Sequence, residues 1–128
     1  MRYQAFDPSR QFLDIRPNGD AVAHQNNSEF WPSLIEGRIE LEGSLFCVLT
    51  FGSDWSHWER HPAGDELLLL QTGAAEIELE SEAGRVETIR LNRDTPAFLV
   101  PRGIWHRVRA EQDSRIAFLT PGENTEHR

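Results

Sequence analysis

Short runs of apolar and β-branched residues alternate with turn-forming residues along most of this chain, from about residue 34 onward. No window of helical length in this region repeats its apolar residues at the 3.6-residue period of an amphipathic helix. Short strands at regular spacing, separated by Gly, Pro, Asn and Asp, are typical of small β-sandwiches and β-barrels. The sequence therefore predicts an all-β fold, with strands over residues 35–41, 45–51, 55–59, 66–72, 75–80, 85–91, 97–100, 106–110 and 114–120.

Two local patterns indicate how individual strands are covered. Residues 75–80 alternate apolar and acidic side chains, and residues 86–91 continue the pattern after a turn at Gly84. This pair is interpreted as a hairpin with one buried and one wet face. The run from Leu67 to Leu70 does not alternate, as expected of a strand that is covered on both faces, so we place it centrally.

Composition narrows the classes of function. A chain of 128 residues suffices for one domain. The 21 acidic residues outnumber the 13 basic ones and are spread over the chain, which disfavours a nucleic-acid partner because phosphates are held by clustered basic side chains. The longest apolar runs are far shorter than the roughly 20 residues of a membrane-spanning helix. The first eight residues, MRYQAFDP, lack the apolar stretch of a secretory signal, so we expect a cytoplasmic protein without membrane contact.

Histidine and carboxylate side chains gather between residues 56 and 66. Glu59 and His61 are two positions apart, so on a strand their side chains point the same way. The turn at 62–65 then returns Glu66 on the next strand, and a second tight turn before His106 supplies another imidazole. Two imidazoles and two carboxylates that converge would suit a divalent metal such as Fe, Mn, Ni or Zn, with positions left open for a substrate.

The two clusters resemble the two signature motifs of the cupin superfamily. Glu59-x-His61-x4-Glu66-x6-Gly73 and Pro101-x-Gly103-x2-His106 occur in the family's order, and the resemblance covers about residues 35–120. It implies a single-domain cupin-type jelly-roll β-barrel, a double-stranded β-helix of the cupin 2 type. The barrel would comprise residues 34–121, between an N-terminal extension over residues 1–33 and a C-terminal tail over residues 122–128.

The resemblance also implies a set of metal ligands. In the family pattern two histidines of an H-x-H pair, a following glutamate and a histidine of the second motif hold the metal. Carried over residue by residue, these positions are Glu59, His61, Glu66 and His106. Glu59 departs from the pattern by replacing the first histidine, while Thr95 and Ala110 replace a glycine and an asparagine.

The carboxylate at position 59 has consequences with and without a metal. It keeps a ligand atom but adds negative charge, which favours harder metals. Without a metal, Glu59 and Glu66 would repel each other, and one of them should hold its proton with a raised pKa. The alternative interpretation is a metal-free pocket in which Glu59 bonds Arg60, Arg107 or another group of the barrel wall.

Two classes of function follow from this site. In the first, the chain is an enzyme, such as a dioxygenase or an isomerase, that acts on a small oxygen-containing substrate through a Lewis-acid metal. Glu59 and His57, which share one strand face, would then move protons. In the second, the barrel is a non-catalytic binding or sensing module for a sugar or an organic acid. Arg102 and Arg107 could recognise an anionic ligand, or they could be surface charges paired with carboxylates.

The two ends of the chain carry weaker signals. We expect most of the first thirty residues to be irregular, apart from a short strand or helix near residues 12–16, and residues 121–128 to fray. The apolar side chains within residues 3–16 could add a strand to a neighbour's sheet edge, which predicts a homodimer. Cys47 cannot form an internal disulfide and is expected to be buried. His24 and His127 offer no interpretable signal.

Overall fold

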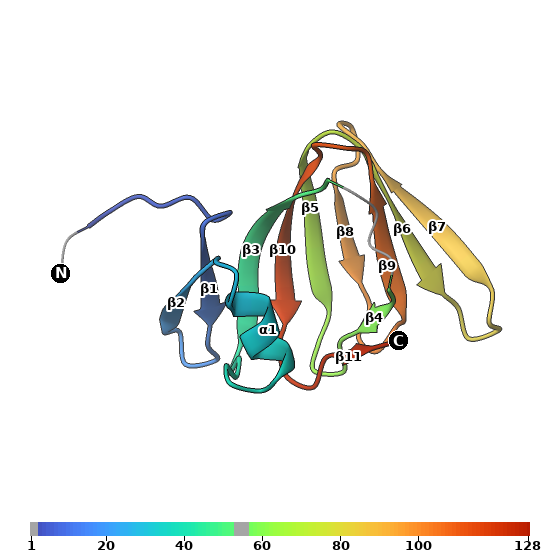
Figure 1. The fold of residues 1–128 in the computed structure, drawn as a ribbon. Coiled ribbons are helices and arrows are strands. Elements are labelled where there is room, and N and C mark those ends of the chain that lie inside the picture. Colours follow the sequence, from blue (N-terminus) through green and yellow to red (C-terminus); the bar gives the residue numbers. More distant parts are fainter. Residues whose placement is uncertain (1–2, 53–56) are drawn as a thin grey trace.

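The computed structural model describes residues 3–52 and 57–128, and within these ranges it has eleven strands and one short helix (Figure 1). The elements in chain order are β1 (Gln11–Ile15), β2 (Ala21–Gln25), α1 (Phe30–Ile35), β3 (Ser44–Thr50), β4 (Glu59–Arg60), β5 (Glu66–Thr72), β6 (Ala75–Glu80), β7 (Val86–Leu91), β8 (Ala97–Val100), β9 (His106–Ala110), β10 (Arg115–Pro121) and β11 (Glu126–His127). None of the described residues belongs to a helix that is long and apolar enough to cross a membrane.

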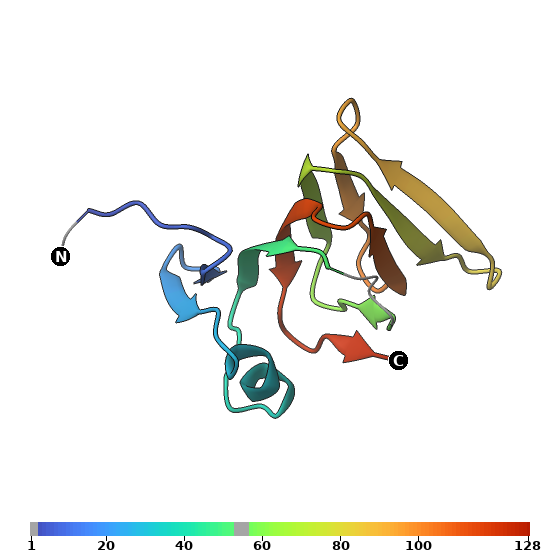
Figure 2. The same ribbon diagram turned by 45° about the horizontal axis from the view of Figure 1, so that its top comes forward.

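The strands form two antiparallel sheets. One sheet has the order β2-β1-β3-β10-β5-β8, and the other has the order β11-β4-β9-β6-β7. Strands that are distant in sequence lie side by side, because β10 pairs with both β3 and β5, and β9 pairs with both β4 and β6. Figure 2 shows the two sheets on opposite sides of a common interior. The predicted all-β jelly-roll architecture is confirmed, and so is the hairpin of β6 and β7.

The interior is filled by the inward side chains of both sheets. On β5 these are Glu66, Leu68 and Leu70, and they alternate with the outward Leu67 and Leu69. The outward pair is 39% and 42% exposed, so the prediction of a strand covered on both faces is wrong. A strand with one face toward solvent needs apolar residues only at every second position, but β5 carries leucine at all four positions from 67 to 70.

The predicted strand over residues 35–41 is also wrong. α1 ends at Ile35, and turns lead from there to β3. The helix is anchored by the buried Phe30, whose ring lies 5.1 Å from Phe12 of β1, and the N–H of Glu36 bonds the carbonyl of Pro32. The apolar side chains of Ile35, Ile39 and Leu41 line a cavity instead. Figure 1 shows α1 beside β3.

Two further boundaries differ from the predictions. β4 covers Glu59–Arg60, so it shares only Glu59 with the strand expected over residues 55–59. Residues 55 and 56 lie outside the described residues. Residues 11–25, expected to be mostly irregular, form the hairpin of β1 and β2. The buried carboxylate of Asp14 fastens this hairpin by accepting hydrogen bonds from the N–H groups of Glu42 and Gly43, at 3.0 and 2.9 Å. In this structure β1 pairs with β3 of its own chain. The exchange of a strand with a neighbouring chain, and with it the homodimer, stay predictions.

Gly73, the last residue of the first motif, has a structural role in the turn between β5 and β6. Its φ is +89°, and an added Cβ would lie 2.1 Å from Oγ of the buried Ser114. The Ser114 hydroxyl is held in place by the backbone of Ala74, from which it accepts a hydrogen bond and to which it donates one. Only glycine fits this turn without strain.

We expect Gly73→Ala to lower the free energy of unfolding by about 2 kcal/mol or more, through the left-handed backbone and the clash with Ser114. Gly84→Ala is the matched control, because Gly84 has a φ of +72° but no atom within 4 Å of the added Cβ. Urea unfolding of both variants separates the two contributions. Equal losses in the two variants would show that the contact with Ser114 contributes nothing.

Candidate metal centre

Four side chains that the sequence predicts as metal ligands meet on the inner surface of the barrel. Glu59 lies on β4, His61 follows that strand, Glu66 begins β5 and His106 begins β9. Glu59 and His106 are direct cross-strand partners. All four residues are buried, with exposed fractions between 1% and 9%. The structure therefore brings the four positions together from three strands and one turn.

The turns of the two motifs are tied to each other. The carboxylate of Asp65, in the first turn, accepts a hydrogen bond from the N–H of Arg102 at 2.8 Å. The N–H of Gly103 donates to the carbonyl of His61 at 3.1 Å. Gly103 has a φ of +74°, a conformation that glycine adopts without strain. These bonds set the position of His61 relative to the strand that carries His106.

The hydrogen bonds of His106 define its tautomer. Its Nδ1 lies 3.0 Å from the carbonyl oxygen of Ile104, which can only accept, so Nδ1 carries a proton. Its Nε2 lies 2.9 Å from Oε1 of Glu66, and Oε2 of Glu66 accepts a bond from the Thr120 hydroxyl at 2.6 Å. Nε2 therefore either holds a second proton in an ion pair with Glu66 or offers its lone pair to a metal ion.

His61 is held in the same way. The hydroxyl of Thr125 donates to the carbonyl of Pro121 at 3.4 Å, and its oxygen lies 2.9 Å from Nδ1 of His61. With Nδ1–H donating to Thr125, Nε2 is left with its lone pair facing the interior. This Nε2 is buried and has no hydrogen bond of good geometry, although it lies 3.3 Å from Oε2 of Glu66 and 3.8 Å from Oε2 of Glu59. A buried ring nitrogen that lacks a hydrogen bond and faces two carboxylates is typical of a metal-binding histidine.

The two carboxyl groups have opposite pKa shifts. Burial, and then the charge of Glu66, raises the pKa of Glu59 to about 8. Burial also opposes ionisation of Glu66, but the hydrogen bond from His106 and the neighbouring His61 lower the pKa of Glu66 to about 2. Burial disfavours the charged form of His106, yet its bond to Glu66 raises the pKa of the imidazole. One carboxyl thus holds its proton when no metal is bound, as the sequence predicts, and it is Glu59.

The donor set fits a divalent first-row metal ion. Glu59, His61 and His106 each offer one ligand atom, and these atoms lie within 4.8 Å of one another. Ligands about 2.0–2.2 Å from one ion lie at most about 4.4 Å apart, so only small movements are needed. Glu66 is not part of that group, but its carboxylate oxygens lie within 3.3 Å of Nε2 of both imidazoles, which makes Glu66 the candidate fourth ligand. Both imidazoles already have their Nδ1 protons held by oxygen atoms, which is the usual support of a metal-bound histidine.

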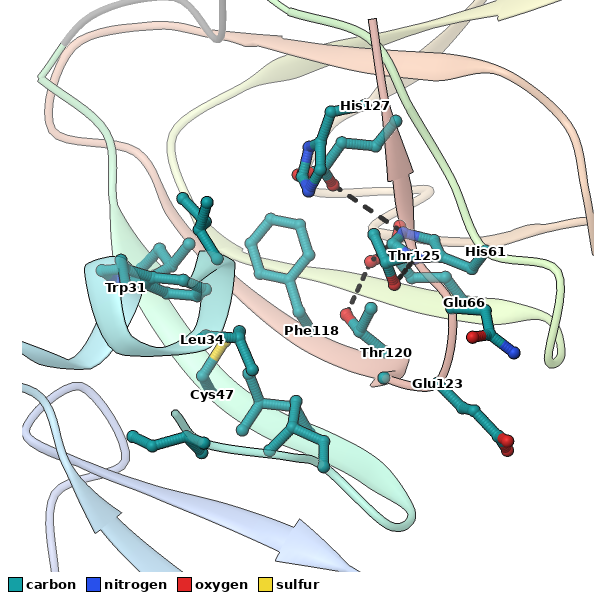
Figure 3. Close-up of a pocket in the computed structure, with 18 of the residues that line it drawn as sticks. Trp31, Leu34, Cys47, His61, Glu66, Phe118, Thr120, Glu123, Thr125 and His127 are labelled. Atoms are coloured by element: carbon teal, nitrogen blue, oxygen red, sulfur yellow. Dashed lines mark hydrogen bonds and ion pairs between the residues drawn. The ribbon is translucent and has the colours of Figure 1, made fainter. Parts of the chain in front are cut away.

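A cavity of about 1140 Å³ opens from these residues. In Figure 3, His61, Glu66 and Thr120 gather at one side of the cavity, while Trp31, Leu34 and Cys47 line the opposite side. Polar ligand atoms at one end and apolar walls at the other are typical of small-molecule sites. Burial raises the pKa of the Cys47 thiol to about 12, so this wall carries no charge at neutral pH.

Neither arginine that could recognise an anion lines this cavity. Arg107 bonds Glu78 at 3.1 Å on the outer face of its sheet, and the backbone N–H of Arg102 bonds Asp65. Arg60, the other suggested partner of Glu59, is paired with Glu126 at 2.6 Å. The alternative in which Glu59 bonds Arg60 or Arg107 is therefore wrong, because both guanidinium groups are engaged with other carboxylates.

The structure adds His127, which sequence reasoning missed, and places the predicted His57 near it. His127 of β11 places its Nδ1 3.4 Å from Oε1 of Glu59, and Nε2 of His57 lies 3.5 Å from the same oxygen. The ligand atoms of these three residues lie within 4.8 Å of one another, so Glu59 is shared between two groups. The expected fraying of residues 121–128 is wrong, because β11 pairs with β4. On an extended strand Trp55 would share the face of Glu59 and His61, which predicts that it lines the pocket, but it lies outside the described residues.

A ladder of guanidinium and indole groups holds β11 in place. Cζ of Arg60 lies 4.8 Å from the Trp105 ring, and Cζ of Arg128 lies 4.6 Å from Trp105 and 5.8 Å from Trp58. Arg128 also bonds Glu80 and exchanges two backbone hydrogen bonds with Trp58. Cation–π contacts of this kind are each worth about 0.5–1 kcal/mol at exposed sites. The ladder therefore positions the strand that carries His127.

We expect Arg128→Ala to loosen residues 125–127 without unfolding the barrel, because it removes two ring contacts and the bond to Glu80. Hydrogen exchange of the Trp58 and Arg128 amides should become about tenfold faster, the equivalent of about 1.4 kcal/mol. Arg90→Ala is the control, since Arg90 also pairs with a carboxylate, that of Glu76, on an exposed surface. Unchanged protection of the Trp58 amide would show that the ladder does not hold β11.

Comparisons with known proteins support the fold. No protein-family model and no curated protein matches the sequence. A cupin-2 domain containing protein from Shewanella frigidimarina is 19% identical, with 65% of this chain and 74% of that chain covered and a TM-score of 0.51. Protein SO0799 from Shewanella oneidensis is 27% identical, with 65% and 59% covered and a TM-score of 0.51.

A third similar structure is hydroquinone 1,2-dioxygenase from Sphingomonas sp. TTNP3, which is 20% identical. The match covers 62% of this chain and 59% of that chain, with a TM-score of 0.50. The chain thus spans less than two thirds of the dioxygenase and of protein SO0799. With two facing antiparallel sheets and both motif turns at the inner cluster, this chain has the fold of the cupin superfamily.

Proposed function

We propose that this chain is a metal-dependent enzyme in which Glu59, His61, Glu66 and His106 hold a divalent first-row metal ion. The observation that carries the proposal is the buried Nε2 of His61, which has no hydrogen bond and faces two carboxylates. When bound, such an ion would act as a Lewis acid that polarises an oxygen atom of a small substrate in the cavity. Fe, Mn, Ni and Zn all suit two nitrogen and two oxygen donors.

Residues of this chain are placed to hold and move protons beside that site. The pKa of Glu59 is raised while that of Glu66 is lowered. Of the two carboxyl groups, Glu59 is therefore the one that can hold a proton near neutral pH and exchange it with a substrate oxygen. His57 lies 3.5 Å from Oε1 of Glu59 with half of its side chain exposed, so it can pass that proton to solvent. Glu59 and His57 are our proposed catalytic residues.

The reaction is best tested first as an oxidation by dioxygen. Sites with histidine and carboxylate ligands and open positions suit ferrous iron. The similar structure named hydroquinone 1,2-dioxygenase supports testing this class first. Isomerisation and related reactions of oxygen-bearing molecules are the next to test, since one fold serves many chemistries.

The proposal is tested by loading tag-free protein with each of the four metals in turn and measuring the bound metal by elemental analysis. We expect about one equivalent of at least one metal at the inner site. Glu59→Gln protein loaded to the same metal content as the wild type then separates an enzyme from a binding module: turnover should fall by at least about 100-fold if Glu59 moves protons. Bound metal and ligand with no turnover in the wild type would indicate a binding module. No bound metal with any of the four would overturn the proposal.

A further inference from the structure

The charge of the cavity lining excludes one large class of substrate. Among the described residues that line the cavity, none is an arginine, and the chain contains no lysine at all. The lining includes acidic side chains along the cavity as well as at its inner end, namely Glu40, Glu42, Glu59, Glu66 and Glu123. A carboxylate or phosphate on the substrate would lose its water there beside acidic side chains, and among the described lining residues only imidazoles and the proposed metal ion could pair with it.

Three arginines near the site are engaged outside the cavity. Arg60 pairs with Glu126, Arg107 with Glu78 and Arg128 with Glu80, and all three lie against the indole rings of the ladder. Moving one of them to an anionic substrate would break an ion pair and at least one ring contact. A net charge of −8 on the chain also disfavours the approach of an anion.

The wall opposite the ligand cluster is apolar and partly open. α1 contributes Trp31, Leu34 and Ile35, and β3 contributes Leu45, Cys47 and Leu49. Trp31 is 37% exposed and Ile35 is 75% exposed although both line the cavity. An apolar molecule seated against α1 would remove this surface from water, which is favourable by about 25 cal/mol per Å².

The position of α1 sets the length of the substrate. The helix lies over β3 at the side of the cavity opposite His61 and Glu66, with Phe118 between them (Figure 3). A substrate that contacts both ends must therefore carry its oxygen atoms at one end and an apolar body at the other. The cavity volume accommodates a substituted ring or an aliphatic body of similar size.

Building on the proposed function, we infer that the substrate is an uncharged molecule with an apolar body, which packs against α1, and with oxygen donors that reach the inner ligand cluster. The inference concerns the walls of the cavity, so it can fail while the metal site stands. It also excludes the organic acids considered from the sequence as ligands of a binding module.

A pair of probes that differ in one group tests the charge preference. 4-Methylcatechol and 3,4-dihydroxybenzoate share the two adjacent oxygen donors and the ring, but only the second carries a carboxylate. Calorimetric titration into zinc-loaded protein, whose metal content is measured beforehand, gives both affinities without turnover. We expect 4-methylcatechol to bind at least about tenfold more tightly, because the carboxylate must be desolvated beside acidic side chains.

Two variants locate the effect in the cavity. Ile35→Ala should weaken 4-methylcatechol by severalfold, while the control Val86→Ala, which removes an exposed apolar side chain on β7, should not. Glu123→Arg, at an exposed position of the lining, should strengthen 3,4-dihydroxybenzoate and narrow the preference. Both substitutions are at exposed positions, so the fold should tolerate them.

Each contrary result has a distinct meaning. Equal or tighter binding of 3,4-dihydroxybenzoate overturns the inference about charge and leaves the metal site standing. Binding of neither probe to protein that holds its zinc overturns the inference as well, since donors and apolar body are both supplied. Ile35→Ala without effect overturns the packing against α1. Failure to bind zinc or any other of the four metals overturns the proposed function itself.

Discussion

Replacing His106 with alanine should abolish stoichiometric metal binding and lower the free energy of unfolding of the metal-free protein by about 3–5 kcal/mol. The imidazole is 1% exposed, and its Nε2 lies 2.9 Å from Oε1 of Glu66, which is 2% exposed. Removing it leaves the Glu66 carboxylate in the interior without its strongest hydrogen-bond donor. Breaking a buried pair by removing one partner is costly because the remaining charge is uncompensated.

Elemental analysis and urea unfolding after treatment with a chelator measure the two effects separately. His24→Ala is the control for loss of an imidazole, because His24 lies on β2 and does not line the cavity. Adding Glu66→Gln to His106→Ala should recover part of the lost stability, since the uncompensated charge is gone, but should not restore metal binding. Full metal content in the His106→Ala variant would contradict the proposed ligand set.

The metal-free protein should lose stability as the pH rises from about 4.5 to 8, and Glu59→Gln should remove most of that loss. Burial, followed by the charge of Glu66, raises the pKa of Glu59 from 4.5 to about 8 in the folded state. The folded protein therefore binds this proton more tightly than the unfolded chain does, so stability falls with pH across the window. The difference between pH 4.5 and 8 should be about 3–5 kcal/mol for this carboxyl.

Glu66 and His106 also make the stability of the metal-free protein depend on pH, but in different pH ranges. The pKa of Glu66 is lowered to about 2, so its contribution to stability is present above 4.5 and is lost as the pH falls toward 2. The pKa of His106 is raised, so its contribution is present below 6.5 and is lost as the pH rises through the folded value. The metal-free protein should thus be most stable near pH 4.5, where Glu66 is ionised while Glu59 and His106 hold their protons.

Urea unfolding at a series of pH values, with a chelator present, checks this prediction. The difference in the free energy of unfolding between the wild type and Glu59→Gln isolates the contribution of one carboxyl group. Glu76→Gln, at an exposed position paired with Arg90, is the matched control. Parallel pH profiles of the wild type and Glu59→Gln would contradict the prediction. With metal bound, the wild type should be more stable than Glu59→Gln, because the substitution then removes a charged ligand.

The local sequence patterns account for much of the fold and for the four clustered side chains. Alternation over residues 75–80 is enough to define the β6–β7 hairpin, because a period of two assigns each side chain to a face. The spacing of Glu59, His61 and Glu66 around a turn brings their side chains together, although β4 and β5 belong to opposite sheets. Apolar residues without a clear period led to two wrong predictions. Residues 35–41 were expected to form a strand but end a helix and continue in turns. The leucines of β5 were expected to be covered on both faces, but two of them point outward.

The sequence by itself determined the all-β architecture and the two motif turns, which follow from local patterns. It also predicted the convergence of Glu59, His61, Glu66 and His106, through the resemblance of its two motifs to the cupin pattern. Only the tertiary structure decided which further groups complete the site. Thr125 bonds His61 across 64 positions, and His127 reaches Glu59 through the pairing of β11 with β4. α1 closes the apolar wall through the packing of Phe30 on Phe12. Contacts between segments so far apart leave no periodic trace in either segment, because the partner and not the local pattern sets their position.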